Sequence, residues 1–221
     1  MTLLGRLGAA LGLGAGIGAG AAGIGWFYSS ALLDTAIRPI YPERVLAVDD
    51  HTVTLVASRL TVQPGIWGLR SPADNLAVLG PVATRRPGVV VRALLGGRAP
   101  APGSAAVFDT GPYDPDPAAR DLRFSEIDVP GPLGSYPAWM VPADGETWAV
   151  HVHGRGGSRR EALRILPALH ALGMSQLVLS YRNDEGAPAS PDGHYHLGDT
   201  EWEDVEAGVR YALDRGARRF V

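Results

Sequence analysis

The sequence predicts an α/β domain that follows an apolar N-terminal helix and a small β-rich module. We place the helix at residues 1–33, the β-rich module at residues 34–123 and the α/β domain at residues 124–221. Three observations support this division: a long uncharged run at the start, short strand-like segments broken by Gly and Pro in the middle, and alternating strand and helix patterns at the end. The expected fold class is therefore α/β.

Composition excludes several classes of protein. The chain has 221 residues, with 20 basic and 23 acidic side chains and a net charge of −3, which argues against a general nucleic-acid-binding protein. It has no cysteine, so disulfide scaffolds, Cys-ligated zinc and a cysteine nucleophile are excluded. Every basic residue is Arg, which also excludes a lysine Schiff base and a P-loop lysine. We expect no cofactor and no metal.

The first segment is apolar enough to enter a membrane. Residues 7–33 form a run of 27 residues without a charged side chain, and about 20 suffice to span a bilayer. Aromatic residues at 26–28 lie where an interfacial belt is expected. The sequence thus predicts a single-pass membrane anchor. The alternative is a secreted protein whose signal peptide is removed near Ser29-x-Ala31.

The middle segment reads as strands and turns. Residues 52–56, 76–79 and 89–91 are rich in β-branched and apolar side chains, and Gly and Pro cluster between them. Nothing in residues 34–123 looks like a catalytic arrangement, so no function is read from this module.

The last segment alternates strands with helices. Two helices are expected to begin at capping boxes, Ser158-x-x-Glu161 and Thr200-x-x-Glu203, in which side-chain oxygens accept from the first free N–H groups. Expected strands occupy residues 138–141, 147–153 and 176–181, and another begins at Arg219. Strands that alternate with helices imply parallel pairing and right-handed crossovers.

Three stretches of this segment resemble a known family. They are VHVHGRGG at 150–157, SYRNDEG at 180–186 and EWEDV at 201–205. Their order and spacing resemble the front part of the α/β-hydrolase fold in its serine-hydrolase form, which includes esterases, lipases and peptidase-like enzymes. The resemblance covers residues 124–221. Asn183 departs from it, because a Gly is common at that place.

The resemblance implies an activity and a site. Full-length members cleave ester, thioester or amide bonds through an acyl-enzyme, so we expect an enzyme whose substrate is a small-molecule or lipid-like acyl compound. Backbone N–H groups stabilise the negative charge that acyl transfer builds on the carbonyl oxygen. By resemblance, Arg155 and Gly156 supply these N–H groups, and His153 and Gly154 belong to the same oxyanion loop.

The nucleophile itself is missing. No Gly-x-Ser-x-Gly elbow occurs in the 221 residues, and Ser158 reads as a helix cap. The resemblance places the nucleophile, acid and base after the strand that begins at Arg219. We therefore expect an N-terminal fragment that holds part of an oxyanion hole, no triad residue and no activity alone.

Two other functions stay open. His151-x-His153, with His194 and His196 elsewhere, could ligate a metal in a metal-dependent hydrolase, although a buried, hydrogen-bonded role is the simpler reading for His151. A non-catalytic, membrane-tethered binding module would use the β-rich region instead.

The remaining acidic residues are assigned plain roles. We expect Asp184 to lie in a solvated loop, and the alternative is that it flanks a substrate pocket. The acidic start of the second helix, including Glu201 and Asp204, is attributed to the helix macrodipole.

Overall fold

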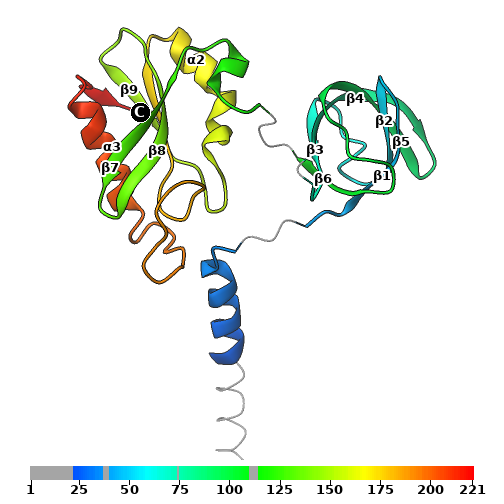
Figure 1. Ribbon diagram of the computed structural model, residues 1–221, viewed down its shortest axis with the longest axis horizontal. Helices are drawn as coiled ribbons and strands as arrows, with labels where there is room; N and C mark the ends of the chain where they lie inside the picture. Colours follow the sequence, from blue (N-terminus) through cyan, green and yellow to red (C-terminus); the bar gives the residue numbers. More distant parts are fainter. Residues whose placement is uncertain (1–21, 37–39, 74, 110–113) are drawn as a thin grey trace, which may run out of the picture.

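The computed structural model describes residues 22–36, 40–73, 75–109 and 114–221. Figure 1 shows two β-structures, a barrel and a sheet flanked by helices, together with a helix at residues 22–33. Residues 37–39 and 110–113, which connect the barrel to the other parts, lie outside the described residues.

The barrel is closed and entirely antiparallel. Its strand order is β1-β2-β5-β4-β3-β6, and β1 pairs with β6 through Glu43 opposite Ala106. The register between β4 and β5 shifts three times, and such irregularities bend and twist a strand, as closure of a barrel requires. The strands are β1 (Glu43–Val48), β2 (Thr52–Val56), β3 (Trp67–Arg70), β4 (Leu76–Arg86), β5 (Val89–Gly97) and β6 (Ala105–Asp109).

Alternation of side chains fills the barrel. Val53 and Leu55 of β2 are fully buried while their neighbours are not, as expected for strands with one face inward. Trp67 stacks on Phe108 with ring centroids 4.6 Å apart. The buried apolar cluster consists of Val45, Val53, Leu55, Leu69, Ala77, Leu79, Val90, Ala106 and Phe108.

A fully buried arginine lies among these apolar side chains. The Arg92 guanidinium lies 5.2 Å from the centre of the Phe108 ring. Its N–H groups donate only to backbone carbonyl oxygens, at 2.6–3.0 Å, on Thr61, Gln63, Gly65 and Gly80. Arg92 thereby fixes the path of the loop between β2 and β3.

The second β-structure is a five-stranded mixed sheet. Its order is β11-β9-β10-β8-β7, with β9 parallel to both β10 and β11, and β8 antiparallel to β10 and β7. The sequence predicted parallel pairing of the strands at residues 147–153 and 176–181. The parallel pair of β9 and β10 confirms it. The strands are β7 (Ser125–Gly131), β8 (Gly134–Val141), β9 (Thr147–His151), β10 (Ser175–Leu179) and β11 (Arg219–Phe220).

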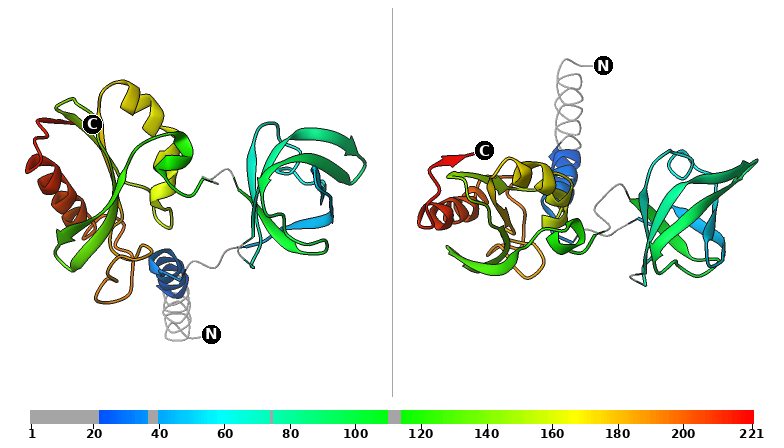
Figure 2. Two further views of the ribbon diagram at one scale, coloured as in Figure 1. Left: turned by 45° about the horizontal axis from the view of Figure 1, so that its top comes forward. Right: turned by 90° about the horizontal axis from the view of Figure 1, so that it is seen from above.

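Helices cover both faces of this sheet (Figure 2). Leu177 and Leu179 of β10 pack with α3 (Trp202–Leu213) on one face, and Val178 packs with Leu163 and Leu166 on the other. The second group belongs to η2 (Arg159–Arg164) and α2 (Leu166–Ala171). A further short helix, η1 (Pro117–Arg120), precedes β7.

The helices differ from the prediction at their starts. Ser158 precedes a 3₁₀ turn and makes no side-chain cap, and Glu201 rather than Thr200 precedes α3, also without a side-chain cap. Both expected capping boxes are therefore wrong. Pro167 lies in the first turn of α2, where its missing N–H costs nothing.

The buried face of α3 is also not the predicted one. The apolar pattern of residues 202–213 predicts that Trp202 and Leu213 face the core, yet they are 55% and 49% exposed. The buried residues of α3 are Asp204, Gly208 and Ala212. A Cβ atom at Gly208 would clash with the Leu179 side chain, so small residues let the helix axis approach the sheet closely.

The predicted fold class as a whole is wrong. We expected an α/β-hydrolase sheet behind a membrane helix and a small β-rich module, but the middle of the chain is a complete six-stranded antiparallel barrel. The described residues hold few helices: α2, α3 and residues 22–33, besides the 3₁₀ turns.

The predicted membrane anchor is also corrected. Of residues 7–33, positions 7–21 lie outside the described residues, and positions 22–33 form a helix. Among the described helices, none combines the length and the apolar character needed to cross a bilayer. The predicted single-pass localisation is therefore not supported.

Candidate functional site at the 154–157 turn

The glycine-rich segment after β9 forms a tight turn. Gly157 N–H donates to the Gly154 carbonyl at 2.9 Å, and Gly156 has a φ of 68°. These features define a type II turn, whose third position favours glycine because of its positive φ. Within the described residues, the N–H groups of Arg155 and Gly156 have no hydrogen-bond partner. They remain available to an acceptor from outside the turn.

His153 is held between two acceptors just before the turn. Its Nε2 lies 2.9 Å from an Asp184 carboxylate oxygen, and its Nδ1 lies 2.9 Å from the Gly154 carbonyl. Burial lowers the pKa of His153, but the hydrogen bonds and the charge of Asp184 outweigh burial and raise it. Because both ring nitrogens face acceptors, this arrangement favours the imidazolium form.

We expected Asp184 to lie in a solvated loop, and this prediction is wrong. Its side chain is only 8% exposed, and besides His153 it accepts the Tyr181 backbone N–H at 2.7 Å. The Tyr181 ring stacks on His153 with centroids 4.6 Å apart. Burial and nearby acidic groups raise the pKa of Tyr181, so its hydroxyl stays protonated.

The Gly154 carbonyl is surrounded by donors. Besides Gly157 N–H and His153 Nδ1, the Tyr181 hydroxyl lies 3.2 Å away, and it also donates to the His153 carbonyl at 3.0 Å. The Gly154 carbonyl and the Arg155 N–H belong to one peptide group. Donors on the oxygen polarise that group, which makes the Arg155 N–H a stronger donor.

An apolar cavity of about 370 Å³ opens beside this turn. Arg155, Gly154 and His153 contribute to its wall, whereas Gly156 does not line it. The structure thus gathers three of the four predicted site residues around one space. The apolar and aromatic part of the wall comes from Val152, Tyr181, Tyr195, Leu197, Trp202 and Val205.

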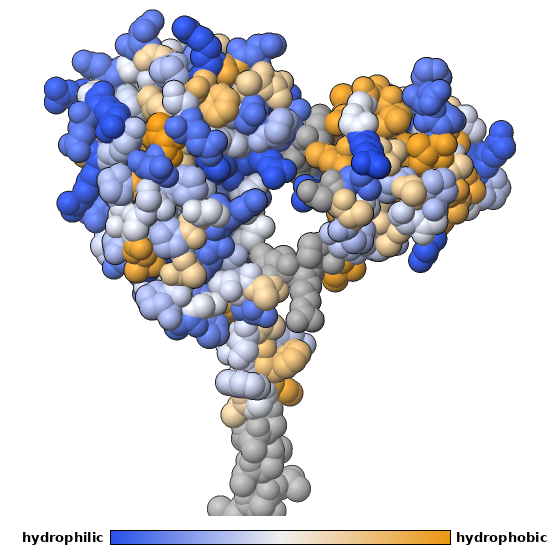
Figure 3. Space-filling view, in the orientation of Figure 1, coloured by the Kyte–Doolittle hydropathy of each residue, from blue (hydrophilic) through white to orange (hydrophobic). Residues whose placement is uncertain are grey.

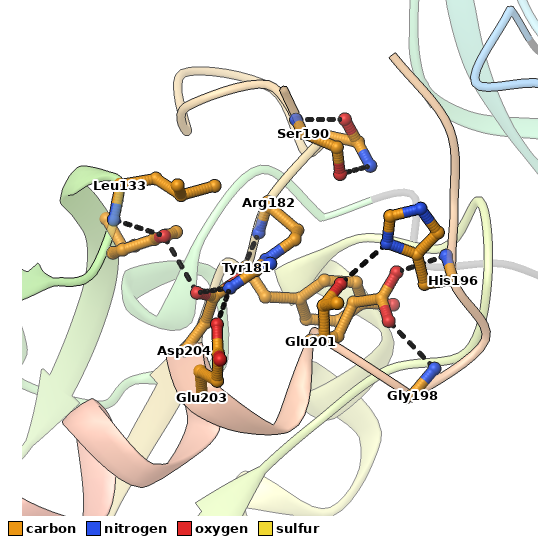
Figure 4. A network of polar contacts seen from close by, with 12 residues as sticks. Leu133, Tyr181, Arg182, Ser190, His196, Gly198, Glu201, Glu203 and Asp204 are labelled. Carbon is orange, nitrogen blue, oxygen red and sulfur yellow. Dashed lines mark hydrogen bonds and ion pairs between the residues drawn. The ribbon is translucent and has the colours of Figure 1, made fainter. Parts of the chain in front are cut away.

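Glu201 organises the loop at residues 195–198, which also lines the cavity. Its carboxylate accepts the N–H of His196 at 2.7 Å and the N–H of Gly198 at 2.8 Å (Figure 4). Burial alone would raise the pKa of Glu201, but these backbone donors lower it. Glu201 is thus a buried anion with a fixed structural task, and the helix macrodipole explains only part of its position.

A buried ion-pair network joins β10, α3 and β8. The Arg182 guanidinium and backbone N–H donate to both oxygens of Asp204 at 2.8–2.9 Å, and the Tyr136 hydroxyl donates to Asp204 at 2.7 Å (Figure 4). Burial, then the bond to Asp204, raises the pKa of Tyr136 to about 12. Sequence reasoning missed this network, although an arginine directly after a buried strand was a usable signal.

The histidines do not form a metal site in the described part of the chain. His151 Nε2 lies 3.0 Å from Gln176 Oε1, while His153 is committed to Asp184. His196 lies 2.9 Å from Asp192 and 2.8 Å from Thr200. No group of three or more potential ligands from His, Cys, Asp and Glu occurs among the described residues.

Comparisons with known proteins give two findings. A family model described as a domain of unknown function (DUF8805) matches residues 44–109, which are the barrel. An esterase from Pyrococcus furiosus is similar in structure, with 17% identity and a TM-score of 0.40. The match covers 48% of this chain and 42% of the esterase, so this chain spans less than half of that protein. No curated protein matches.

These findings overturn the predicted family. The matching family model lies outside the stretches that carried the resemblance, and its function is unknown. A likeness at this TM-score and identity carries no argument for the α/β-hydrolase family. That assignment, with the hydrolase and membrane descriptions attached to it, is withdrawn, and the site must be interpreted from its own geometry.

Proposed function

We propose that the cavity beside the 154–157 turn binds the acyl part of a small ester, thioester or amide, and that the Arg155 N–H hydrogen-bonds its carbonyl oxygen. The observation that carries the proposal is that Arg155, whose backbone N–H has no hydrogen-bond partner among the described residues, lines an apolar cavity. The cavity volume is within the range usual for small-molecule sites.

The Arg155 N–H is a free donor for an oxygen that gains negative charge. The nearby acceptors are already engaged, because the Asp184 carboxylate contacts His153 and the Gly154 carbonyl accepts from Gly157 and Tyr181. Acyl transfer builds negative charge on the carbonyl oxygen, and a donor already aimed at that oxygen lowers the barrier. We therefore propose an enzymatic role in acyl transfer, in which this site stabilises the carbonyl oxygen of the acyl group.

The part played by these residues is binding and polarisation. The 221 residues contain no Gly-x-Ser-x-Gly elbow. We accordingly assign the described residues to holding the acyl group and stabilising its carbonyl oxygen, and we assign none of them as nucleophile.

The proposal is tested with two variants and two probes. Arg155→Pro and Arg155→Ala both lose the guanidinium, but only the proline loses the N–H, and proline suits the second position of a type II turn. Phenylacetamide carries a carbonyl, and propylbenzene is its carbonyl-free counterpart. Affinities are followed by quenching of tryptophan fluorescence, since Trp202 lines the cavity.

We expect Arg155→Pro to bind phenylacetamide about tenfold more weakly than Arg155→Ala does, which is the usual cost of one hydrogen bond. Propylbenzene should bind both variants equally. If Arg155→Pro lost the same affinity for both probes, or if the two variants bound phenylacetamide equally well, the N–H would not engage a carbonyl. The Trp202→Ala variant lacks the reporting side chain, so its binding is measured by calorimetry. Unchanged binding of both probes by this variant would show that the cavity is not the site.

A further inference from the structure

The C-terminal end of the helix at residues 22–33 meets the loop that forms part of the cavity wall. Tyr195 N–H donates to the Leu33 carbonyl at 2.8 Å, and Asp34 pairs with His194 as an isolated antiparallel bridge. The Thr35 hydroxyl donates to the Gly193 carbonyl at 2.9 Å. Residues far apart in sequence are thus joined through backbone groups.

The Arg155 side chain joins the same helix end to the turn. Its Nη2 donates to the Ala31 carbonyl at 3.1 Å and to the Asp34 carbonyl at 3.3 Å. Its guanidinium also lies 5.3 Å from the centre of the Tyr195 ring. The last carbonyls of a helix lack partners within the helix, and a cation there is favoured by the macrodipole.

The rest of this helix is held by little else. Ile24, Trp26, Phe27 and Tyr28 are 62–72% exposed, and Figure 3 shows hydrophobic residues on the described part of this helix next to the grey atoms. Apolar packing therefore does not fix these residues against the sheet. Polar contacts at the C-terminal end set the attachment.

We propose that residues 31–35 are an integral support of the cavity and that Arg155 is the positioning residue that couples them to it. The Arg155 side chain is anchored on the helix end, while its backbone N–H lies in the turn and Tyr195, which its guanidinium contacts, also lines the cavity. Anchoring the side chain restricts the orientation of the turn. Only the ligand part of this inference rests on the proposed function.

A disulfide tests the attachment without any ligand. Asp34 and His194 form a non-hydrogen-bonded antiparallel pair next to the bond from Tyr195 N–H to the Leu33 carbonyl. Cα atoms in such pairs are usually about 4.5 Å apart, which suits a disulfide. The chain has no cysteine of its own, so Asp34→Cys/His194→Cys reports this contact alone. The control is Asp34→Cys/Arg215→Cys, whose second cysteine lies just beyond the C-terminal end of α3.

We expect the first pair to cross-link rapidly under mild oxidation and the control pair not to. Adding Arg155→Ala should slow cross-linking about tenfold, in keeping with the loss of charge-assisted hydrogen bonds. Ethylguanidinium should restore the rate, because it replaces the missing group; this rescue separates a lost contact from misfolding.

Each outcome decides a separate point. Cross-linking no faster than in the control would show that residues 31–35 do not dock. A rate unaffected by Arg155→Ala, or not rescued by ethylguanidinium, would remove Arg155 from the coupling. In the ligand measurement, ethylguanidinium should also restore phenylacetamide binding to Arg155→Ala. Normal cross-linking without any phenylacetamide binding by the unmodified chain would overturn the proposed function and leave the docking intact.

Discussion

The barrel and the sheet each bury an arginine, and they satisfy it in opposite ways. Arg92 in the barrel donates only to backbone carbonyls, whereas Arg182 beside the sheet donates to the carboxylates of Asp204 and Glu203. Burial lowers the pKa of Arg92. The hydrogen bond to Asp204, opposed by burial, raises the pKa of Arg182.

The difference follows from how each β-structure completes its hydrogen bonding. In the barrel, free carbonyls lie in the loop between β2 and β3 and at Gly80, where the pairing of β4 with β5 is irregular, and one buried cation donates to all of them. The sheet has a helix on each face, so side chains from α3 reach the end of β10 and fix the loop that follows. The barrel therefore uses its arginine to hold a loop inward, and the sheet uses its arginine to support a cavity wall.

The largest effect is expected for Arg182→Met. Asp204 has a fully buried side chain and would lose its cation, which usually costs about 3–5 kcal/mol. Urea unfolding and hydrogen exchange at β10 and α3 measure the loss. Adding Asp204→Asn should recover part of it, because no buried charge then remains. If the double variant lost as much stability as the two single variants together, or more, this account would be contradicted.

A smaller effect is expected for Arg92→Met in the barrel. No charge is left behind, so the cost should be about 2–3 kcal/mol, as for hydrogen bonds to a charged group. Hydrogen exchange at residues 57–66 and at β5 should rise. The matched control is Arg70→Met, whose ion pair with Asp109 is 35% exposed and should contribute no more than about 1 kcal/mol. Similar losses for both variants would contradict the role given to Arg92.

The smallest effect concerns pH. The pKa of His153 is raised in the folded protein, so His153 adds stability below its unfolded value of about 6.5, and this contribution is lost as the pH rises through the folded value. The stability difference between the unmodified protein and Asp184→Asn should therefore be largest at acidic pH and fall to a constant offset at alkaline pH. In a His153→Gln background the difference should be flat. A difference that grows with pH would contradict the assigned direction.

Local patterns predicted some elements and not their assembly. The strand before His153 and its parallel neighbour were predictable because apolar runs, turns and helices alternate along the chain. Barrel closure was not, because the pairing of Glu43 with Ala106 joins distant residues and leaves no periodic signal. The buried face of α3 was missed because Gly208 and Ala212 pack by close approach rather than by bulk.

The part of the candidate site that lies in one continuous stretch of sequence was predictable. His153, Gly154 and Arg155 follow one strand, and their glycine-rich spacing indicates a tight turn. Tyr195 and Trp202 reach the cavity only because the intervening loop is tied at Asn183 and Glu201. Asn183 has a φ of 72°, a conformation that favours Gly or Asn, and its side chain donates to the Ser190 hydroxyl.

The outer strand β7 has a bearing on self-association. Pairing with β8 alone, it exposes one row of backbone groups at the sheet margin. Asp128 and Pro130 lie on the exposed face of β7, together with Glu126, which pairs with Arg159. Charged side chains disfavour pairing with a second copy of the strand, and proline withholds a donor, so the margin resists the addition of foreign strands that seeds aggregates. The barrel, being closed, needs no such protection.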